Sequence, residues 1–101
     1  MTTVISPQLL KALTDLTGEI HLDSALRMVT QQAIAHRLES IAKQLHTLEQ
    51  KYGMSFEQFN VSFQAGALSN QYSYEVEQNY LEWEGLLCRQ RRLQEVRDWL
   101  R

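Results

Sequence analysis

Cys88 is the only cysteine of the chain and the residue best suited to nucleophilic chemistry. Arg89, Arg91 and Arg92 follow it, and nearby positive charge favours the reactive thiolate over the thiol. No histidine that could serve as its base lies close to it in the sequence. The cysteine instead adjoins an apolar helical stripe, which is typical of a packing role. A single cysteine cannot form an internal disulfide, so nothing in the sequence points to an oxidising compartment.

The three histidines, His21, His36 and His46, are the candidate metal ligands. His36 and His46 are ten residues apart, about 280° around a helix, so they cannot bind one metal ion from the same face. His36 and Glu39 do share a face, but two ligands alone are weak support for a site. The sequence has no glycine-rich phosphate loop, nucleophile elbow, paired-cysteine zinc spacing or His-Glu-x-x-His motif. We therefore expect no metal, no cofactor and no enzyme active site.

Arg89, Arg91 and Arg92 are the first group of candidate binding residues. They could contact phosphates or an acidic partner protein, or they could pair with neighbouring glutamates or stand in water. Twelve acidic residues against ten basic ones give a net charge of -2, without the positive excess that is typical of duplex-binding proteins. Bulk charge therefore does not favour nucleic acid. Arginine is common in protein interfaces, so a partner protein fits this group better.

Tyr74, Glu77 and Glu84 are the second group of candidate binding residues. Helical spacing places them away from the apolar residues of the same segment, so they would present an acidic, partly aromatic stripe. Such a stripe could dock a basic partner protein. The alternative is a face that is simply solvated.

Capping signals predict four helices that position these residues. Ser6 and Gly18 are placed to begin and end the first helix. Asp23 is expected to cap the second helix and Gly53 to end it. The run SFEQ, which starts at Ser55, is a capping box that opens the third helix. The predicted helices span residues 7–17, 23–52, 56–66 and 74–100.

The second helix carries the most regular apolar pattern. Its apolar residues recur at steps of 4, 3, 4, 3 and 4, which is typical of a helix that packs on another helix. This stripe is made of Ile34, Leu38, Ile41, Leu45, Leu48 and Tyr52. The last helix has a stripe of its own, made of Val76, Tyr80, Trp83 and Leu87.

The second helix is too long for the rest of the chain to cover its apolar face. Thirty helical residues extend for roughly 45 Å, whereas a compact domain of this length has a radius of gyration of only about 13 Å. The rest of the chain cannot wrap such a helix. We therefore expect one elongated all-α domain that forms a homodimer, in which the two apolar stripes pack both within and between chains.

The overall composition is that of a globular protein. Apolar residues make up 44% of the chain, which is enough for a core. No apolar run approaches 18 residues, and no charged-then-apolar leader opens the chain, so neither a membrane span nor a signal peptide is expected. A soluble cytoplasmic protein is the expectation.

Three segments carry a resemblance to a known family: residues 25–39, 49–59 and 73–84. The most specific of them is the run KYGMSFEQF, which begins at Lys51. Together they resemble a family of small helical proteins of cyanobacteria and other prokaryotes that are described as antitoxin-like. The resemblance implies a protein that binds and neutralises a partner toxin and is not a catalyst. The alternative is a helical scaffold subunit of a larger assembly that has no toxin partner.

Overall fold

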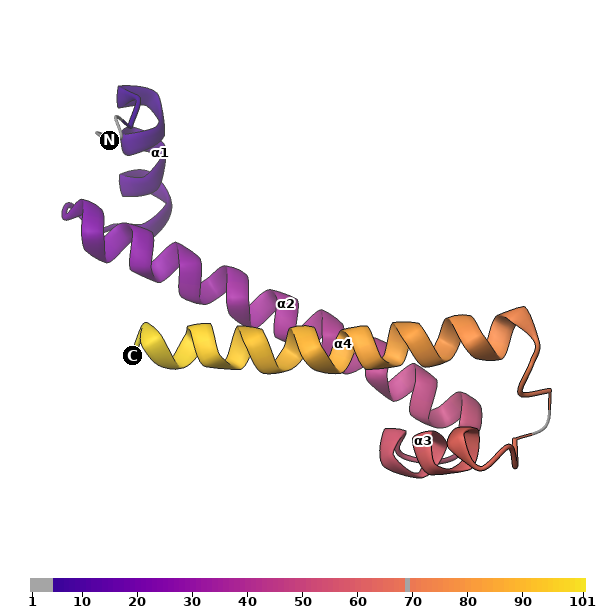
Figure 1. Ribbon diagram of the computed structural model, residues 1–101. Coiled ribbons are helices and arrows are strands. Elements are labelled where there is room, and N and C mark those ends of the chain that lie inside the picture. Colours follow the sequence, from indigo (N-terminus) through magenta and orange to yellow (C-terminus); the bar gives the residue numbers. More distant parts are fainter. Residues whose placement is uncertain (1–4, 69) are drawn as a thin grey trace.

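The computed structural model describes residues 5–68 and 70–101, which form four α-helices joined by short connections (Figure 1). The helices are α1 (Pro7–Thr17), α2 (Leu22–Tyr52), α3 (Phe56–Gln64) and α4 (Tyr74–Trp99). No strand occurs among the described residues. The prediction of an all-α fold with two long and two short helices is therefore confirmed.

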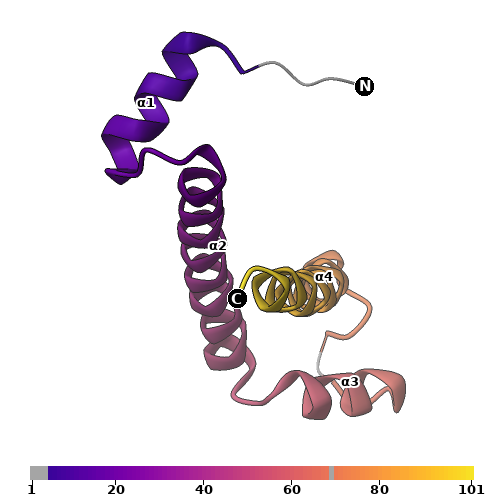
Figure 2. The same ribbon diagram turned by 90° about the vertical axis from the view of Figure 1, so that its left-hand side faces the viewer.

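The molecule is elongated, as predicted, with extents of 57 × 26 × 21 Å and a Cα radius of gyration of 19.7 Å. In Figure 1 α2 and α4 cross, with the chain running in opposite directions along them, and Figure 2 shows α4 nearly end-on beside α2. The short helix α3 lies under the end of α2. The other short helix, α1, projects from the start of α2, away from the body (Figure 2).

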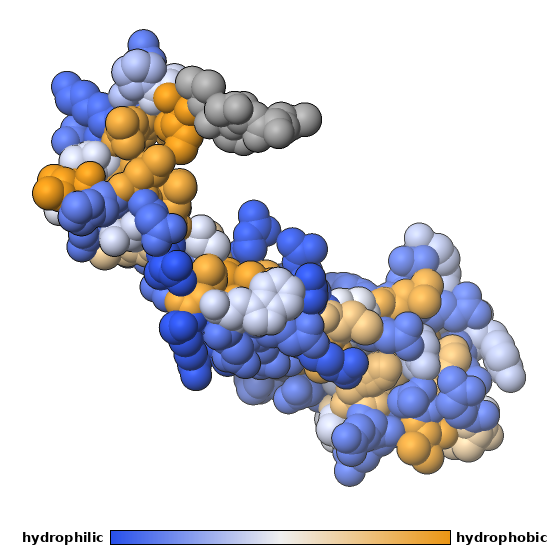
Figure 3. All heavy atoms as spheres, turned by 60° about the vertical axis from the view of Figure 1, so that its left-hand side comes forward, coloured by the Kyte–Doolittle hydropathy of each residue, from blue (hydrophilic) through white to orange (hydrophobic). Residues whose placement is uncertain are grey.

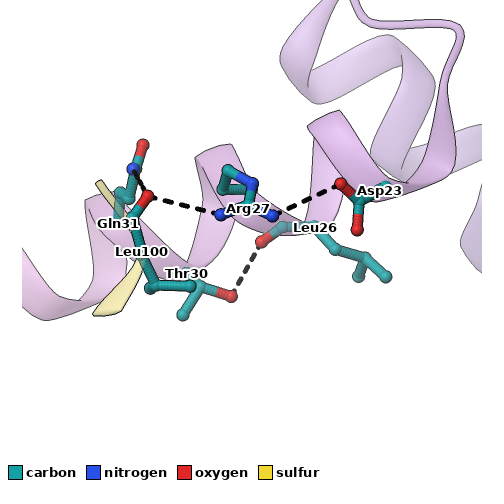
Figure 4. A network of polar contacts seen from close by, with 6 residues as sticks. All are labelled: Asp23, Leu26, Arg27, Thr30, Gln31 and Leu100. Carbon is teal, nitrogen blue, oxygen red and sulfur yellow. Dashed lines mark hydrogen bonds and ion pairs between the residues drawn. The ribbon is translucent and has the colours of Figure 1, made fainter. Parts of the chain in front are cut away.

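The C-terminal end of α4 is attached to the first half of α2. The side-chain nitrogens of Arg27 and Gln31 both donate to the carbonyl oxygen of Leu100, at 3.4 and 3.0 Å (Figure 4). These two hydrogen bonds satisfy a carbonyl that the end of a helix leaves without an intrahelical partner. They fix the end of α4 on α2, close to the place where α1 begins to project.

The start of α2 differs from the prediction by one residue. The helix begins at Leu22, so its N-cap is His21 and not Asp23, and His21 makes no capping hydrogen bond with its side chain. Asp23 lies in the first turn, where its carboxylate pairs with Arg27 at 3.5 Å. A negative charge in the first turn complements the helix dipole, so the aspartate supports the helix without capping it.

The predicted capping box between α2 and α3 is confirmed. The amide of Gln58 donates to Ser55 Oγ at 3.3 Å, and the amide of Ser55 donates to Gln58 Oε1 at 3.1 Å. Ser6 and Ser73 cap α1 and α4, each accepting a hydrogen bond from the backbone amide three residues further on. Local side-chain chemistry therefore sets the start of three of the four helices.

α3 is two residues shorter than predicted and ends at Gln64. Gly66 adopts a left-handed backbone with a φ of 70°, which stops the helix before residue 66. The amide of Ala67 then donates to the carbonyl of Ser62 at 2.9 Å, which is the closing hydrogen bond of a Schellman motif. α4 ends at Trp99, one residue before the predicted boundary.

Gly53 ends α2 with a left-handed φ of 65°, and its amide donates to the carbonyl of Glu49 at 2.8 Å. Replacing Gly53 with alanine is expected to lower the free energy of unfolding by about 1–2 kcal/mol, because an L side chain is strained in this conformation. Urea denaturation followed by circular dichroism measures the loss. Gly53→Asn should cost less, since asparagine tolerates left-handed backbone. An alanine variant as stable as the parent would contradict this role.

The buried core lies where α2, α3 and α4 meet. Its side chains are Ile41, Leu45, Leu48, Phe59, Val76 and Trp83. Phe59 has no exposed surface and Trp83 is 1% exposed. The ring centroid of Phe59 lies 5.1 Å from that of Trp83 and 4.6 Å from that of Tyr52. An aromatic cluster therefore joins the three helices at this end of the molecule.

The two predicted apolar stripes contribute most of this core. On α2, Ile34, Ile41, Leu45 and Leu48 are buried, and Leu38 and Tyr52 are partly buried. On α4, Val76 and Trp83 are buried, and Tyr80 and Leu87 are partly buried. Within one chain the two stripes pack on each other and on α3. The stripes therefore serve the interior of the single chain.

Candidate protein-interaction surfaces

The helix α1 is held to the rest of the chain by little apolar packing. Of its side chains only Leu13 is buried, and it meets the start of α2, where Ala25 is buried as well. Burial of one leucine contributes about 1.5–3 kcal/mol, whereas fixing the backbone of each residue costs about 1–2 kcal/mol. α1 has 11 residues, and isolated helices shorter than about 12–15 residues are marginal in water. Its packing within the chain does not account for its order.

A group of exposed apolar side chains surrounds this weakly held helix. We call it the arm surface; it comprises Leu9, Leu10, Leu16, Ile20, Leu22 and Leu26. Leu16 is 71% exposed and Ile20 is 82% exposed. Figure 3 shows apolar side chains on α1 next to the open space that separates this helix from the body. Six exposed apolar side chains in one part of a small protein are typical of an interaction site.

The arginine group predicted as a binding site is divided by the structure. Arg89 lines a groove of about 290 Å³ between α4 and α2, together with Arg37, Ser40 and Gln44. Arg91 lines a different groove, of about 300 Å³, beside α3. Arg92 pairs with Glu95 at 3.1 Å and stacks on the ring of Trp99, with 4.7 Å from its guanidinium carbon to the ring centroid. The three arginines therefore do not form one site.

The acidic group lies at the surface. Tyr74, Glu77 and Glu84 are all exposed on α4, and Glu84 lines the same groove as Arg91. The neighbouring Glu75 accepts a hydrogen bond from the ammonium group of Lys51, which joins the start of α4 to the end of α2. This hydrogen bond lowers the pKa of Glu75 and raises the pKa of Lys51, because each charge favours the other.

The residues considered for catalysis or metal binding are spread over the surface. His21, His36 and His46 are each exposed on α2 or at its N-cap. Cys88 is exposed beside Glu84 and Arg91, and no histidine lines that groove. In residues 5–68 and 70–101, no group of three or more histidine, cysteine, aspartate or glutamate side chains is placed to hold a metal ion.

The sequence of α1 contains an apolar stripe, but it does not reveal the arm surface. Leu9, Leu13 and Leu16 have the spacing of an ordinary core-facing helix. The structure buries Leu13 and leaves the other two exposed. Helical spacing shows which side chains share a face, but not whether another element covers that face. Leu10 and Ile20 of the arm surface lie outside this stripe.

Two further findings concern the chain as a whole. None of the described helices is sufficiently long and apolar to span a membrane. No protein-family model matches the chain, and neither a curated protein nor a solved structure matches it.

Proposed function

We propose that this chain is an antitoxin-like protein–protein interaction module that works in the cytoplasm as a homodimer. In this proposal it binds and neutralises a partner toxin, and it has neither a catalytic role nor a cofactor. The arm surface carries the proposal, because it exposes apolar side chains on a helix that the chain itself barely holds. A partner that covers α1 would supply the burial that the isolated chain lacks.

The mode of binding follows from the shape of the arm. α1 is a short helix with an apolar face, so it fits an apolar groove in which leucines at helical spacing act as anchors. Leu9 and Leu16 lie seven residues apart on one face and would serve as such anchors. The partner class is therefore a protein with a hydrophobic groove. The resemblance of residues 25–39, 49–59 and 73–84 to the antitoxin-like family supports the same role.

Self-association has its own support in the exposed area. The chain exposes 7598 Å², whereas a compact monomer of its mass would expose about 5,900 Å². The excess, about 1,700 Å², is roughly twice the area that each partner contributes to an interface of standard size, about 800 Å². One chain therefore has enough surplus surface for a second copy and for a partner protein.

The scaffold subunit remains the second candidate function. Its specific support is the elongated shape, with a length of 57 Å, which suits a spacer between two components of an assembly. Both candidates are binding proteins, and they differ in what happens to the bound partner. An antitoxin abolishes the activity of its partner, whereas a scaffold leaves that activity in place.

Co-expression with the product of the adjacent gene tests the antitoxin role. Expressed alone, that product should arrest growth, and expression of this chain should restore it. Leu16→Asp should abolish the rescue, because a charge on the arm surface opposes burial in a groove. Val61→Asp is the matched control, since Val61 is similarly exposed, at 68%, but lies on α3. If the neighbouring product is harmless alone, the scaffold function replaces the antitoxin function.

A further inference from the structure

The outward face of α4 carries a second regular seam, opposite the one that enters the core. Its positions recur at steps of 4, 3, 4, 3, 4, 3 and 4, and every one of them is exposed. We call it the outer seam: Tyr74, Gln78, Leu81, Gly85, Cys88, Arg92, Glu95 and Trp99. Positions at alternating steps of four and three share one face of a helix, which is the face that a second helix packed along it would contact. The seam lies opposite the buried face of α4, which holds Val76 and Trp83. It borders α3 at Cys88, in the groove that Arg91 also lines.

Apolar residues stand at both ends and in the middle of the outer seam. Tyr74 is 77% exposed, Leu81 is 60% exposed and Trp99 is 63% exposed. Between them Gly85 lies in the interior of the helix, where glycine costs about 0.5–1 kcal/mol relative to alanine. A Cβ built on Gly85 meets nothing within 4 Å. Packing within the chain therefore gives no reason for this glycine, whereas close approach of another helix would.

The charges that flank the outer seam are sorted along the helix. Glu82 and Glu84 lie in its first half, and Arg89 and Arg91 lie in its second half. If two copies of α4 pack in opposite directions about a two-fold axis between positions 86 and 87, Glu82 of each copy lies beside Arg89 of the other. Glu84 of each copy likewise lies beside Arg91 of the other. Parallel packing in register would pair Glu84 of one copy with Arg89 of the other but would also place Glu77 beside Glu82, so it gains less from these charges.

The same two-fold axis also matches the seam positions with one another. Gly85 of one copy meets Cys88 of the other at the centre, where two small side chains allow close approach. At each end, Tyr74 of one copy meets Trp99 of the other, and two aromatic rings gain from contact. The flanking pair Glu77 and Asp98 has like charges, and it falls at the ends of the interface. There the Nε atoms of Arg97 and Arg101 each lie 3.9 Å from Oδ1 of Asp98, so these two arginines offset its charge.

We propose that the homodimer forms by antiparallel packing of α4 on α4 of a second copy along the outer seam. This inference rests on the self-association proposed above and adds the surface, the direction and the register. A second copy is the occupant because the central small residues and the flanking charges of the seam are complementary to themselves, as a two-fold interface requires. In the two remaining layers Leu81 meets Arg92, and Gln78 meets Glu95. The chain as a whole has a surplus area of about 1,700 Å², of which an interface of standard size would use about 800 Å².

Cross-linking through the native cysteine tests the register. In the proposed dimer the two Cys88 side chains lie near the axis, with roughly 4.5 Å between them along the helix direction. A short bis-maleimide should therefore convert the unmodified protein into a covalent dimer. The control is Cys88→Ser combined with Val61→Cys, which moves the only thiol to an exposed site on α3 and should stay uncross-linked. Cross-linking of the control but not of the native protein would overturn the inference.

Charge reversal tests the direction of packing. Glu82→Arg with Glu84→Arg places arginine beside arginine in the proposed dimer, and the dissociation constant should rise at least tenfold. Adding Arg89→Glu and Arg91→Glu restores opposite charges and should restore dimerisation. All four side chains are exposed, so circular dichroism should show unchanged folding. A double variant that dimerises as tightly as the parent would reject the seam.

Gly85→Ala distinguishes an effect on dimerisation from an effect on folding. The added methyl group meets nothing in the single chain, so the thermal stability of the monomer at low concentration should rise slightly. In the proposed dimer the same methyl group stands between the helices, so the dissociation constant should rise several-fold. Circular dichroism measures the thermal stability of the monomer, and sedimentation velocity measures the dissociation constant of the dimer. If the parent dimerises but none of these variants alters the dimer, the outer seam is wrong and self-association stands; a parent that is monomeric throughout rejects both.

Discussion

Replacing Phe59 with alanine is expected to lower the free energy of unfolding by about 3–5 kcal/mol. Phe59 has no exposed surface, and its ring lies against those of Tyr52 and Trp83 at the point where three helices meet. A domain of this size has a total stability of about 5–15 kcal/mol, so the variant loses a large share of it. Urea denaturation followed by far-ultraviolet circular dichroism measures the change.

The matched control for this substitution lies two residues away on the same helix. Val61→Ala removes side-chain carbons from α3 at a position that is 68% exposed, so its effect should stay within about 0.5 kcal/mol. The comparison separates loss of core packing from a general weakening of α3. A loss below about 1 kcal/mol for Phe59→Ala would mean that the aromatic cluster does not hold the three helices together.

Replacing Ile41 with aspartate is expected to unfold the chain. Ile41 is 4% exposed and packs in the core between α2 and α4. Loss of a buried isoleucine side chain costs about 2–5 kcal/mol. Burial of the carboxylate adds to this cost, and Arg37 and Arg89, which line the same groove, offset only part of it. Far-ultraviolet circular dichroism should show loss of helix, and light scattering should find no folded monomer.

Ala42→Asp provides the control at the next position of α2. Ala42 is exposed, so an aspartate there remains hydrated and costs only its lower helix propensity, about 0.7 kcal/mol at most. If Ile41→Asp gave a folded, monomeric protein, the stripe that begins at Ile34 would pack between chains in the dimer and not within one chain.

The two proposed surfaces are compatible in a single assembly. The arm begins where the C-terminal end of α4 is fixed on α2 through Leu100. In an antiparallel α4 pair the two C-terminal ends point in opposite directions. The two arms would therefore stand at opposite ends of the dimer, and each would be free to bind one partner. A partner that is itself dimeric or repeated would gain avidity from this arrangement.

Much of the local structure could be predicted from the sequence, because its causes lie within a few residues. Ser55 and Gln58 exchange hydrogen bonds three positions apart, and Gly53 needs only its own backbone freedom to end a helix. Errors occurred where two local signals competed. Asp23 was expected to cap α2, but the helix starts earlier and uses the aspartate in its first turn.

The surfaces could not be predicted in the same way. Leu9 and Leu16 on α1 are apolar and seven residues apart, as are Ile41 and Leu48 on α2, yet the first two are exposed and the last two are buried. What distinguishes them is the path of the chain after residue 52. α3 and α4 return over the second half of α2, and among the described helices none returns over α1 (Figure 2).

The sequence by itself determined the four helices, their principal stops and the stripe that forms the core. Hydrogen bonds and helical periodicity act over three or four residues, so their outcome can be read from neighbouring positions. Only the tertiary structure decided which apolar faces are covered. Burial depends on contacts between segments far apart in the chain, such as Tyr52 with Trp83, and these depend on where the turns direct each helix. The arm surface and the outer seam are the faces that this path leaves uncovered.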